Sequence, residues 1–566
     1  MNQSQTTQPR MLKNKSHITK IVVLLLILII VNVVGNRIYK RFDLTQDHRY
    51  TLSEAALNTV KNVDSPLIVN VFLDGDFPSE YRRLQTETRQ LLEEFSLYNS
   101  EVKFNFINPM EDEKTKDANI QQLIDRGLEP LQLSTKESGK SSQALIFPWA
   151  LASYHDQTVK ISLIKNTIGA TADETVTNSV QNLEYAFAEG FKKLVTPKSK
   201  KVAILKGNGE LGDGHIYDFV STIRDHYFMA PFTLDSVVNN PQGTLKAIKD
   251  YDLIIVAKPT QAFTEEEKYV LDQYTMNGGK SLWLTESIIM DKDSLFNDTG
   301  SAVAIMQDLN LNDFFFKYGV RINPEIVNDL YSAPIMLAIG EGSQAQFQPV
   351  QWQYSPLAGT NPDHPITNNL NLVKFDFASQ IDTLKNSVKK TILLRSSELT
   401  KLEGVPKQIS LDMVTQDPNP KTYTKGSQTL ALLLEGEFTS VYNNRIKPFK
   451  LSEGTDKSVS TKMIVISDGD VIKNELVKGK PQELGFDRWT GRKFGNKEFL
   501  ENAVNYLLND DGLINIRSKE VVIPFLDAQK VESEKTKWQF INIALPLLLL
   551  AIFGFVFNYF RKRRWT

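Results

Sequence analysis

The sequence predicts a mixed α/β protein in which two extracytoplasmic α/β units lie between two transmembrane helices. Two observations lead to this prediction. A long apolar run lies near each end of the 566-residue chain, and short apolar strands alternate with amphipathic helices between the two runs. A short polar linker, PKSKK at residues 197–201, divides the alternating pattern into two units.

Composition excludes several classes of protein. The chain has 65 basic and 67 acidic side chains, and this balance does not suggest a nucleic-acid partner. It has no cysteine, which excludes disulfides, Cys-ligated zinc and thiol catalysis. Its six histidines show no spacing typical of a metal site. We therefore expect no catalytic residue, no cofactor and no metal.

The first apolar run, IVVLLLILIIVNVVG within residues 18–38, is long enough with its flanks to cross a bilayer. A secretory signal peptide is the main alternative, but the stretch Val34-Gly35-Asn36-Arg37 makes a poor cleavage site. The sequence favours an uncleaved anchor over 18–38, preceded by a cytoplasmic tail over 1–17.

The second apolar run covers residues 540–560 and is followed by a basic cluster of Arg561, Lys562, Arg563 and Arg564. Basic residues beside a span remain in the cytoplasm, and the charges around the first span are nearly balanced, so the C-terminal cluster sets the orientation. We expect both termini in the cytoplasm and the body across the membrane, which is the periplasm in a Gram-negative cell. The four basic side chains are candidates for contact with anionic lipid headgroups or an ATPase.

The elements of the first unit follow the first span. A juxtamembrane helical segment is expected over 39–62, where Thr51 and Glu54 have the spacing of a capping box. In the unit over 63–196, the strand LIVNVFL, an amphipathic helix from about Ser79 and the strand VKFNFINP form a βαβ pattern with a parallel pair. Strands at LQLST, ALIFPWAL and TVKISLI and a closing helix complete a unit that resembles thioredoxin-like folds. Without Cys-x-x-Cys it can have no redox role.

The second unit, over 197–520, begins with the strand VAILK and continues with DLIIVAKP and SLWLT, with helices between them. It ends with the strands TLALLLEGEF and KMIVISDGDVI and a helix over 497–508. Residues 290–425 hold shorter Asn- and Pro-rich segments, whose boundaries the sequence leaves open. A linker over 521–539 leads to the second span.

The stretch NGGKS at 277–281 looks like the end of a nucleotide-binding P-loop. A P-loop also needs a glycine where Tyr274 stands, and it leaves a strand and enters a helix. Here the order is reversed, so we expect Gly278 and Gly279 to end a helix in the usual way. A second near match, GKS at 139–141, also lacks the first glycine. The chain is therefore not predicted to be an ATPase.

The candidate ligand or partner loop consists of Gly207, Asn208, Gly209 and Glu210, which follow the first strand of the second unit. The carboxyl ends of parallel strands are where α/β sheets commonly bind ligands. The loop fits no dinucleotide fingerprint, because no helix opens at Gly212. Two interpretations stay open: a glycine-rich turn, and a contact with a small ligand or glycan through Asn208 and Glu210.

Two histidines and one Glu-Ser pair are not expected to form catalytic sites. His155 beside Asp156, and His226 beside Asp225, are expected to be surface pairs. The stretch Glu286-Ser287 follows a strand but lacks the small residues of a nucleophile elbow.

Several blocks of the chain resemble the auxiliary components of ABC-2-type exporters, and among them the gliding-motility-associated proteins of Bacteroidetes. The blocks are FDLTQDHRYTLSEAA, LIVNVFLDGDFP, FNFINP, NSVQNLEY, ILKGNGE, DLIIVAKPTQAFTEEEKYVLDQYTMNGGKSLWL, LNLNDFFFKYGVRIN and FGNKEFLENAVNYLLNDDGLINIRSKEV. They extend over residues 42–521, and both spans accompany them.

The resemblance implies a membrane-anchored, non-catalytic partner of an ABC permease and a separate ABC ATPase. Envelope or motility proteins and membrane lipids are further expected partners. It also implies a central domain similar to the GIFT domain, which resembles the class I glutamine amidotransferase fold. Enzymes of that fold use an elbow cysteine, and this chain has none. The alternative function is a periplasmic module that binds a glycan or lipid-linked substrate of an exporter.

Overall fold

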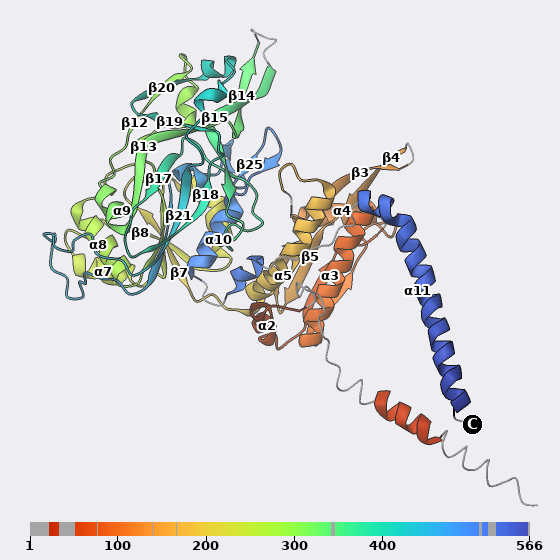
Figure 1. Ribbon diagram of the computed structural model, residues 1–566. Coiled ribbons are helices and arrows are strands. Elements are labelled where there is room, and N and C mark those ends of the chain that lie inside the picture. The colour runs from red at the N-terminus through yellow and green to blue at the C-terminus, as the bar shows by residue number, and fades with distance from the viewer. Residues whose placement is uncertain are drawn as a thin grey trace, which may run out of the picture. The chain divides into compact units, whose positions relative to one another are not determined.

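The computed structural model describes residues 22–32, 51–75, 77–137, 140–165, 167–340, 346–508, 512–518 and 528–563. The chain divides into two compact units, Met1–Thr51 and Leu52–Thr566. Within the second unit, helices and several sheets alternate along the chain, which confirms the mixed α/β class (Figure 1). The domain boundaries expected at the 197–201 linker and at residue 520 remain predictions.

The first part of the larger unit is built on a four-stranded sheet with the order β2-β1-β5-β6. Its strands are β1 (Leu67–Val71), β2 (Val102–Phe106), β5 (Trp149–Tyr154) and β6 (Gln157–Ser162). Strands β1 and β2 are parallel, and helix α3 (Ser79–Tyr98) connects them, so the predicted βαβ pattern is confirmed. Strands β5 and β6 complete the sheet in antiparallel fashion.

Two long helices pack together on this sheet through an aromatic contact. Phe95 of α3 lies edge-on to Phe191 of α5 (Ala172–Val195), with 5.1 Å between ring centroids, and both rings are fully buried. Such edge-on pairs add to the stabilisation that burial itself provides. The remaining elements of this part are α2 (Glu54–Lys61), α4 (Lys116–Asp125), β3 (Leu131–Glu137) and β4 (Lys140–Ile146).

The capping box predicted at the start of α2 is wrong. Ser53, rather than Thr51, is the N-cap, and its Oγ accepts a hydrogen bond from the Ala56 N–H at 3.2 Å. The Ser53 N–H donates to Glu184 Oε1 on α5 at 2.6 Å. A carboxylate from another helix thus takes the part expected of Glu54, because tertiary packing brings it to the N–H group of the actual N-cap, Ser53.

The larger sheet follows the order β14-β15-β18-β21-β22-β10-β9-β7-β8. Its strands are β7 (Lys201–Lys206), β8 (Phe228–Thr233), β9 (Leu253–Ala257), β10 (Lys280–Leu284), β14 (Ser332–Ile339), β15 (Gln346–Thr360), β18 (Lys389–Arg395), β21 (Thr429–Gly436) and β22 (Thr461–Ile466), and β16 (Val373–Lys374) pairs with β15. The five strands from β22 to β8 are parallel, and β21 pairs antiparallel with β22. The sheet is therefore parallel in one half and antiparallel in the other.

Helices cover both faces of the parallel half, which explains why its strands read as continuous apolar runs. On one face, α6 (Tyr217–Arg224) and α10 (Asn496–Leu508) share a core with Val202, Ile204 and Ile255. On the other face, α7 (Pro241–Ile248), α8 (Glu265–Met276) and α9 (Asn312–Tyr318) share a core with the alternate residues of the same strands. The helix predicted over 497–508 is confirmed.

Residues 290–425, whose boundaries the sequence left open, are rich in strands. They form much of two small sheets, with the orders β11-β12-β20 and β17-β13-β19. The strands are β11 (Ile288–Ile289), β12 (Ser301–Met306), β13 (Val320–Asp329), β17 (Ser379–Thr383), β19 (Thr400–Gly404) and β20 (Lys407–Ser410). Two short hairpins follow later, formed by β23 (Leu476–Val477) with β24 (Lys480–Pro481) and by β25 (Phe486–Asp487) with β26 (Arg492–Lys493).

The NGGKS stretch ends a helix, as predicted. Helix α8 begins with a capping box formed by Thr264 and Glu267 and ends at Asn277. Gly278 has φ +90°, and the ring of Tyr274 lies only 2.3 Å from where a Cβ on Gly279 would stand. The chain then enters β10. The order of helix, turn and strand is the reverse of the order around a phosphate-binding loop. Gly139, of the second near match, lies outside the described residues.

An exposed apolar helix, α11 (Ala528–Arg563), ends the described chain. Its segment Ser533–Arg563 is long and apolar enough to cross a membrane, and it carries Arg561, Lys562 and Arg563 in its last turn. Helix α11 begins inside the expected linker over 521–539, because VESEKTKWQ consists largely of good helix formers. Near the other end, Val22–Asn32 is a shorter apolar helix. The flanks of the expected first span, the tail over 1–17 and Arg564 lie outside the described residues.

Candidate functional site

Buried charged and polar residues gather at the carboxyl edge of the parallel half of the larger sheet. Strand β8 lies on one side of β7, and the next strand along the chain, β9, lies on the other side. The chain therefore reverses direction across the sheet between β7 and β9. Ligands of open α/β sheets bind in the crevice at such a switch point, outside the carboxyl ends of the strands.

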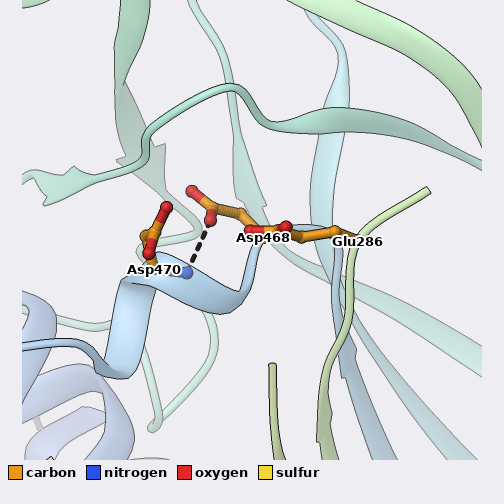
Figure 2. A group of neighbouring side chains, drawn as sticks. All are labelled: Glu286, Asp468 and Asp470. Atoms are coloured by element: carbon orange, nitrogen blue, oxygen red, sulfur yellow. Dashed lines mark hydrogen bonds between the residues drawn. The ribbon is translucent and has the colours of Figure 1, made fainter. Parts of the chain in front are cut away.

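Four charged residues directly follow three neighbouring strands at this edge. Lys258 follows β9, Glu286 follows β10 and Asp468 and Asp470 follow β22. Oxygen atoms from the three carboxylates lie within 4.8 Å of one another. Figure 2 shows the three acidic side chains and the hydrogen bond that links Asp468 to the Asp470 backbone, 2.7 Å long.

The Lys258 ammonium lies among these carboxylates. Its Nζ is 2.7 Å from Asp470 Oδ1 and 3.1 Å from Glu286 Oε1, and all three side chains are nearly inaccessible to solvent. Burial alone would lower the pKa of Lys258, but the charges of Asp470 and Glu286 outweigh burial and raise it. The amine therefore stays protonated at neutral pH.

The backbone of Lys258 is also unusual. Its φ is 54°, in the left-handed region that non-glycine residues seldom adopt. This conformation turns the chain sharply out of β9, immediately before Pro259. This backbone conformation thus helps to place the Lys258 ammonium over the ends of the strands.

Burial raises the pKa of two acidic side chains in the cluster, Asp468 and Glu286. Asp468 is fully buried, and burial together with its acidic neighbours raises its pKa well above the usual range. One oxygen of Asp468 accepts the Asp376 N–H at 2.6 Å. Burial and the nearby Asp470 charge raise the pKa of Glu286, although the Lys258 ammonium, 3.1 Å away, opposes this shift.

Further ion pairs extend the cluster toward solvent. Lys473 Nζ lies 3.2 Å from Asp291 Oδ2 and 3.7 Å from Asp470 Oδ1. Asp291 is partly exposed, with 41% of its side chain accessible, so it marks the outer limit of the cluster. On the inner side, Asp376 pairs with Lys292 and Lys374, each at 3.4 Å, and accepts a hydrogen bond from Ser355.

This geometry argues for a structural ion network. Carboxylate oxygens are suitable ligands for a hard cation, and the three acids are close enough to share one. However, the Lys258 ammonium lies within hydrogen-bond distance of two of them and already supplies the positive charge. An amine held in its protonated form cannot act as a nucleophile or a base. The network ties the ends of β9, β10 and β22 together.

The structure places the sequence-predicted loop at the same edge, beside β9. The Leu211 N–H donates to the Ala257 carbonyl at 3.0 Å, and the N–H groups of Thr260 and Gln261 both donate to the Asn208 carbonyl at 2.9 Å. Asn208 is only 4% exposed, and its Nδ2 donates to Glu267 Oε2 at 3.2 Å. The loop is therefore an ordered turn.

Glycine is required inside this turn. Gly209 has φ +73°, and a Cβ on it would lie 2.1 Å from Thr260 Oγ1. Glu210 folds back so that its Oε2 accepts the Asn208 N–H at 2.8 Å. Burial raises the pKa of Glu210. Asn208, Gly209 and Glu210 thus have a structural part in the turn, while the sequence interpretation of a ligand contact through Asn208 and Glu210 stays a prediction.

The two histidine pairs have different outcomes. His155 is exposed, as expected. The interpretation of His226 as a surface residue paired with Asp225 is wrong, because its side chain is only 13% exposed and its Nε2 lies 3.8 Å from Glu189 Oε1. Burial, together with nearby lysines, lowers the pKa of His226 to about 4.

Sequence analysis missed the Lys258 cluster, although a signal was present. Each apolar strand, LIIVA, SLWL and MIVI, is followed within two residues by a charged or acidic side chain. Charged residues at the ends of buried parallel strands lie at one edge of the sheet and are expected to meet. What the sequence could not provide was the order of the strands, which makes β22 the neighbour of β10.

Comparisons with known proteins give the chain a family. Residues 199–503, more than half of the chain, match the sequence model of a family described as an ABC-type uncharacterized transport system. Residues 46–153 match a domain of unknown function, DUF7088.

One relative and two solved structures are similar over long stretches. An uncharacterized protein of Borreliella burgdorferi is 22% identical over 396 residues, which cover 69% of this chain and 71% of that protein. The N-terminal domain of mmIFT52 is 12% identical, with a TM-score of 0.30, and the match covers 55% of this chain and 99% of that domain. Cytoplasmic Protein STM3548 from Salmonella typhimurium is 10% identical, with a TM-score of 0.25, over 55% of this chain and 99% of that protein. Both TM-scores are below 0.5, so neither establishes a shared fold.

Proposed function

We propose, from the premise that the chain belongs to the family described as an ABC-type uncharacterized transport system, that it is a non-catalytic auxiliary subunit of an ABC-2-type transporter. The family match carries this proposal, because it extends over residues 199–503 and thus over the whole parallel half of the larger sheet. The catalytic step would belong to a separate ATPase, and the transport pathway to a separate permease.

The apolar helices support membrane anchoring of this subunit. Ser533–Arg563 is long enough to cross a bilayer, and the basic residues Arg561, Lys562 and Arg563 at its end favour a cytoplasmic C-terminus. In the proposed topology, residues 18–38 form a second span and both termini are cytoplasmic. The two α/β parts then lie in the periplasm, where they contact envelope or motility proteins and couple them to the permease.

The finer assignment is to the gliding-motility auxiliary proteins of the GldG type. It is supported by the sequence blocks between residues 42 and 521, among them FDLTQDHRYTLSEAA and DLIIVAKPTQAFTEEEKYVLDQYTMNGGKSLWL. In this assignment the first part is a thioredoxin-like unit and the second a GIFT-like unit without amidotransferase activity. The chain lacks the elbow cysteine that such activity needs.

The chemistry of the sheet edge supports a non-catalytic role. The most conspicuous reactive group there, the Lys258 amine, is held protonated by two carboxylates. An internal network of this kind gives a subunit a rigid edge that can transmit force, since breaking it would leave charges buried without partners.

The test is a mild-detergent pull-down of the tagged full-length chain from its native membrane, read by mass spectrometry. Stoichiometric recovery of a polytopic ABC permease, with or without its ATPase, is the expected result. A chain lacking residues 528–566 is the matched control, and we expect it to lose the permease while keeping any periplasmic partner. Recovery of the full chain alone, or with envelope glycan enzymes, would contradict the proposal.

The alternative function is a periplasmic module that binds a glycan or lipid-linked substrate at residues 207–210. It is favoured by one observation: among the described residues, no donor reaches the buried atoms Asn208 Oδ1 and Glu210 Oε1. Substitution of both side chains discriminates the two functions. Loss of transport with an intact complex favours the ligand module, whereas unchanged transport favours the interaction subunit.

A further inference from the structure

Two buried acceptor atoms in the switch-point loop lack a hydrogen-bond donor. Asn208 is 4% exposed, and within the described part of the chain no donor reaches its Oδ1. The same is true of Glu210 Oε1. Buried polar atoms are nearly always paired, so two unpaired oxygens in one turn require an explanation.

Three neighbouring donors bond to other acceptors. The Asn208 N–H donates to the other oxygen of Glu210, and the Asn208 amide donates to Glu267. Lys206, the nearest cationic side chain along the sequence, donates to the Leu211 carbonyl at 2.7 Å and pairs with Asp213 at 2.9 Å. These donors are therefore satisfied by other acceptors, and Asn208 Oδ1 and Glu210 Oε1 have no donor from them.

The charge around the loop is acidic. Burial is the main cause that raises the pKa of Glu210; the Glu267 charge adds to this shift, whereas the Lys206 ammonium opposes it. A Cβ on Gly207 would lie 3.4 Å from Asp235 Oδ1, so a third carboxylate borders the loop. The side chains that surround the two unpaired oxygens thus provide more negative than positive charge.

The Lys258 cluster at the same sheet edge provides an internal comparison. In that cluster three carboxylates converge at the ends of parallel strands, and the chain supplies its own cation, with Lys258 Nζ 2.7 Å from Asp470 Oδ1. At the switch-point loop no described ammonium or guanidinium takes that position. The Lys258 cluster therefore has an ammonium on its carboxylates, whereas no described donor reaches the two unpaired oxygens of the loop.

We propose that the loop over residues 207–210 binds a divalent cation of the hard, oxygen-preferring class, Ca²⁺ or Mg²⁺, through Asn208 Oδ1 and Glu210 Oε1. Carboxylate and amide oxygens are the protein ligands that these ions take. The cation offsets the repulsion between Glu210 and Glu267, and it fixes the turn against the N-terminus of α8. This site goes beyond the proposed function and does not require that the chain assemble with a permease.

The experiment uses the full-length chain in mild detergent, freed of metal with EDTA and titrated with CaCl₂ or MgCl₂ near neutral pH. We expect calorimetry to show one bound ion per chain and thermal unfolding to shift upward with the same ion. Glu210→Gln should weaken binding at least tenfold and abolish the shift. Asp470→Asn, which removes a charge from the Lys258 cluster, is the matched control and should keep the response.

A second variant guards against loss of folding in Glu210→Gln. Glu210→Asp keeps the carboxylate on a side chain one methylene shorter, and it should bind the ion more weakly than the native chain but more tightly than Glu210→Gln. The main rival is a protonated Glu210 that donates to Asn208 Oδ1. In that case neither ion binds at concentrations up to about 10 mM, well above the range of extracellular calcium modules, and Glu210→Gln is at least as stable as the native chain in EDTA. That outcome, or equal binding by the native chain and Glu210→Gln, would overturn the proposal.

Discussion

A Cβ on Gly469 would lie 2.4 Å from the Cβ of Lys258, so the two backbones can pass each other only because residue 469 is a glycine. This close approach brings the loop after β22 against the end of β9. Asp470, the next residue, then reaches the Lys258 ammonium at 2.7 Å. The packing of one glycine thus determines the geometry of a buried ion pair.

Gly469→Ala should destabilise the protein. The added methyl group would overlap the Lys258 side chain and Cα, and overpacking of this kind costs about 1–3 kcal/mol. Urea unfolding measures the loss. Gly404→Ala is the control, because nothing lies within 4 Å of a Cβ there. Equal stability of both variants would contradict the close approach.

Removal of the Lys258 charge should be more damaging. Lys258→Met keeps the length of the side chain but leaves Glu286 and Asp470 without their buried partner, at a cost of about 3–5 kcal/mol. The measurement is the free energy of unfolding at neutral pH. Because the stranded carboxylates can be neutralised, the loss should shrink at acidic pH. Lys473→Met, at a more accessible position, should cost much less.

His364 should make stability depend on pH. Burial, with help from Lys389 and Lys462, lowers the pKa of His364 to about 4, and its Nδ1 accepts the Ile366 N–H at 3.3 Å. An unfolded histidine takes up a proton near pH 6.5, whereas the folded one does not until about pH 4. The stability that this group contributes is therefore present above pH 6.5 and is lost as the pH falls toward 4.

The effect of His364 is measured by urea unfolding at about pH 7 and about pH 5. The native chain should lose about 1 kcal/mol between them through this residue, a figure reduced for its partial exposure. His364→Gln should remove that part of the loss, whereas His155→Gln, at an exposed position, should not. An unchanged pH dependence in His364→Gln would show that the residue is not buried in its neutral form.

Membrane attachment should be lost only when both apolar segments are deleted. The full chain should remain in the membrane pellet after carbonate extraction, because Ser533–Arg563 is long enough to span. A chain without residues 528–566 should also remain there if residues 18–38 form a second span. Deletion of residues 1–38 as well should release the protein. Release after the first deletion alone would establish a single span.

The sequence predicted the local structure well wherever periodicity was strong. The apolar strands, the long helices and the helix end at Gly278 were all foreseen, because each depends on neighbours along the chain. The N-cap at Ser53 was not foreseen, since the carboxylate of Glu184 that completes it comes from another helix. Local patterns cannot show an acceptor that packing brings from far away.

The candidate site divides in the same way. The loop over residues 207–210 was found because its glycines follow a strand directly. The Lys258 cluster was missed because it depends on the order of strands in space, and Glu286 was judged only as a possible elbow. The strand-rich region over 290–425 was hardest to predict, since its two small sheets pair strands that are far apart in the sequence.

The position of β22 has a consequence for the order in which the chain folds. This strand lies between β21 and β10, and at its start Thr461 bonds to Gly279, 182 residues earlier. The loop-closure entropy of such a pairing must be overcome before its contacts can form. While the chain emerges from the ribosome or a translocon, one edge of β10 therefore stays unpaired until all of β22, which ends at Ile466, has been synthesised. An apolar strand held open in this way invites wrong pairings, so folding of this part should depend on rapid completion of synthesis or on a chaperone.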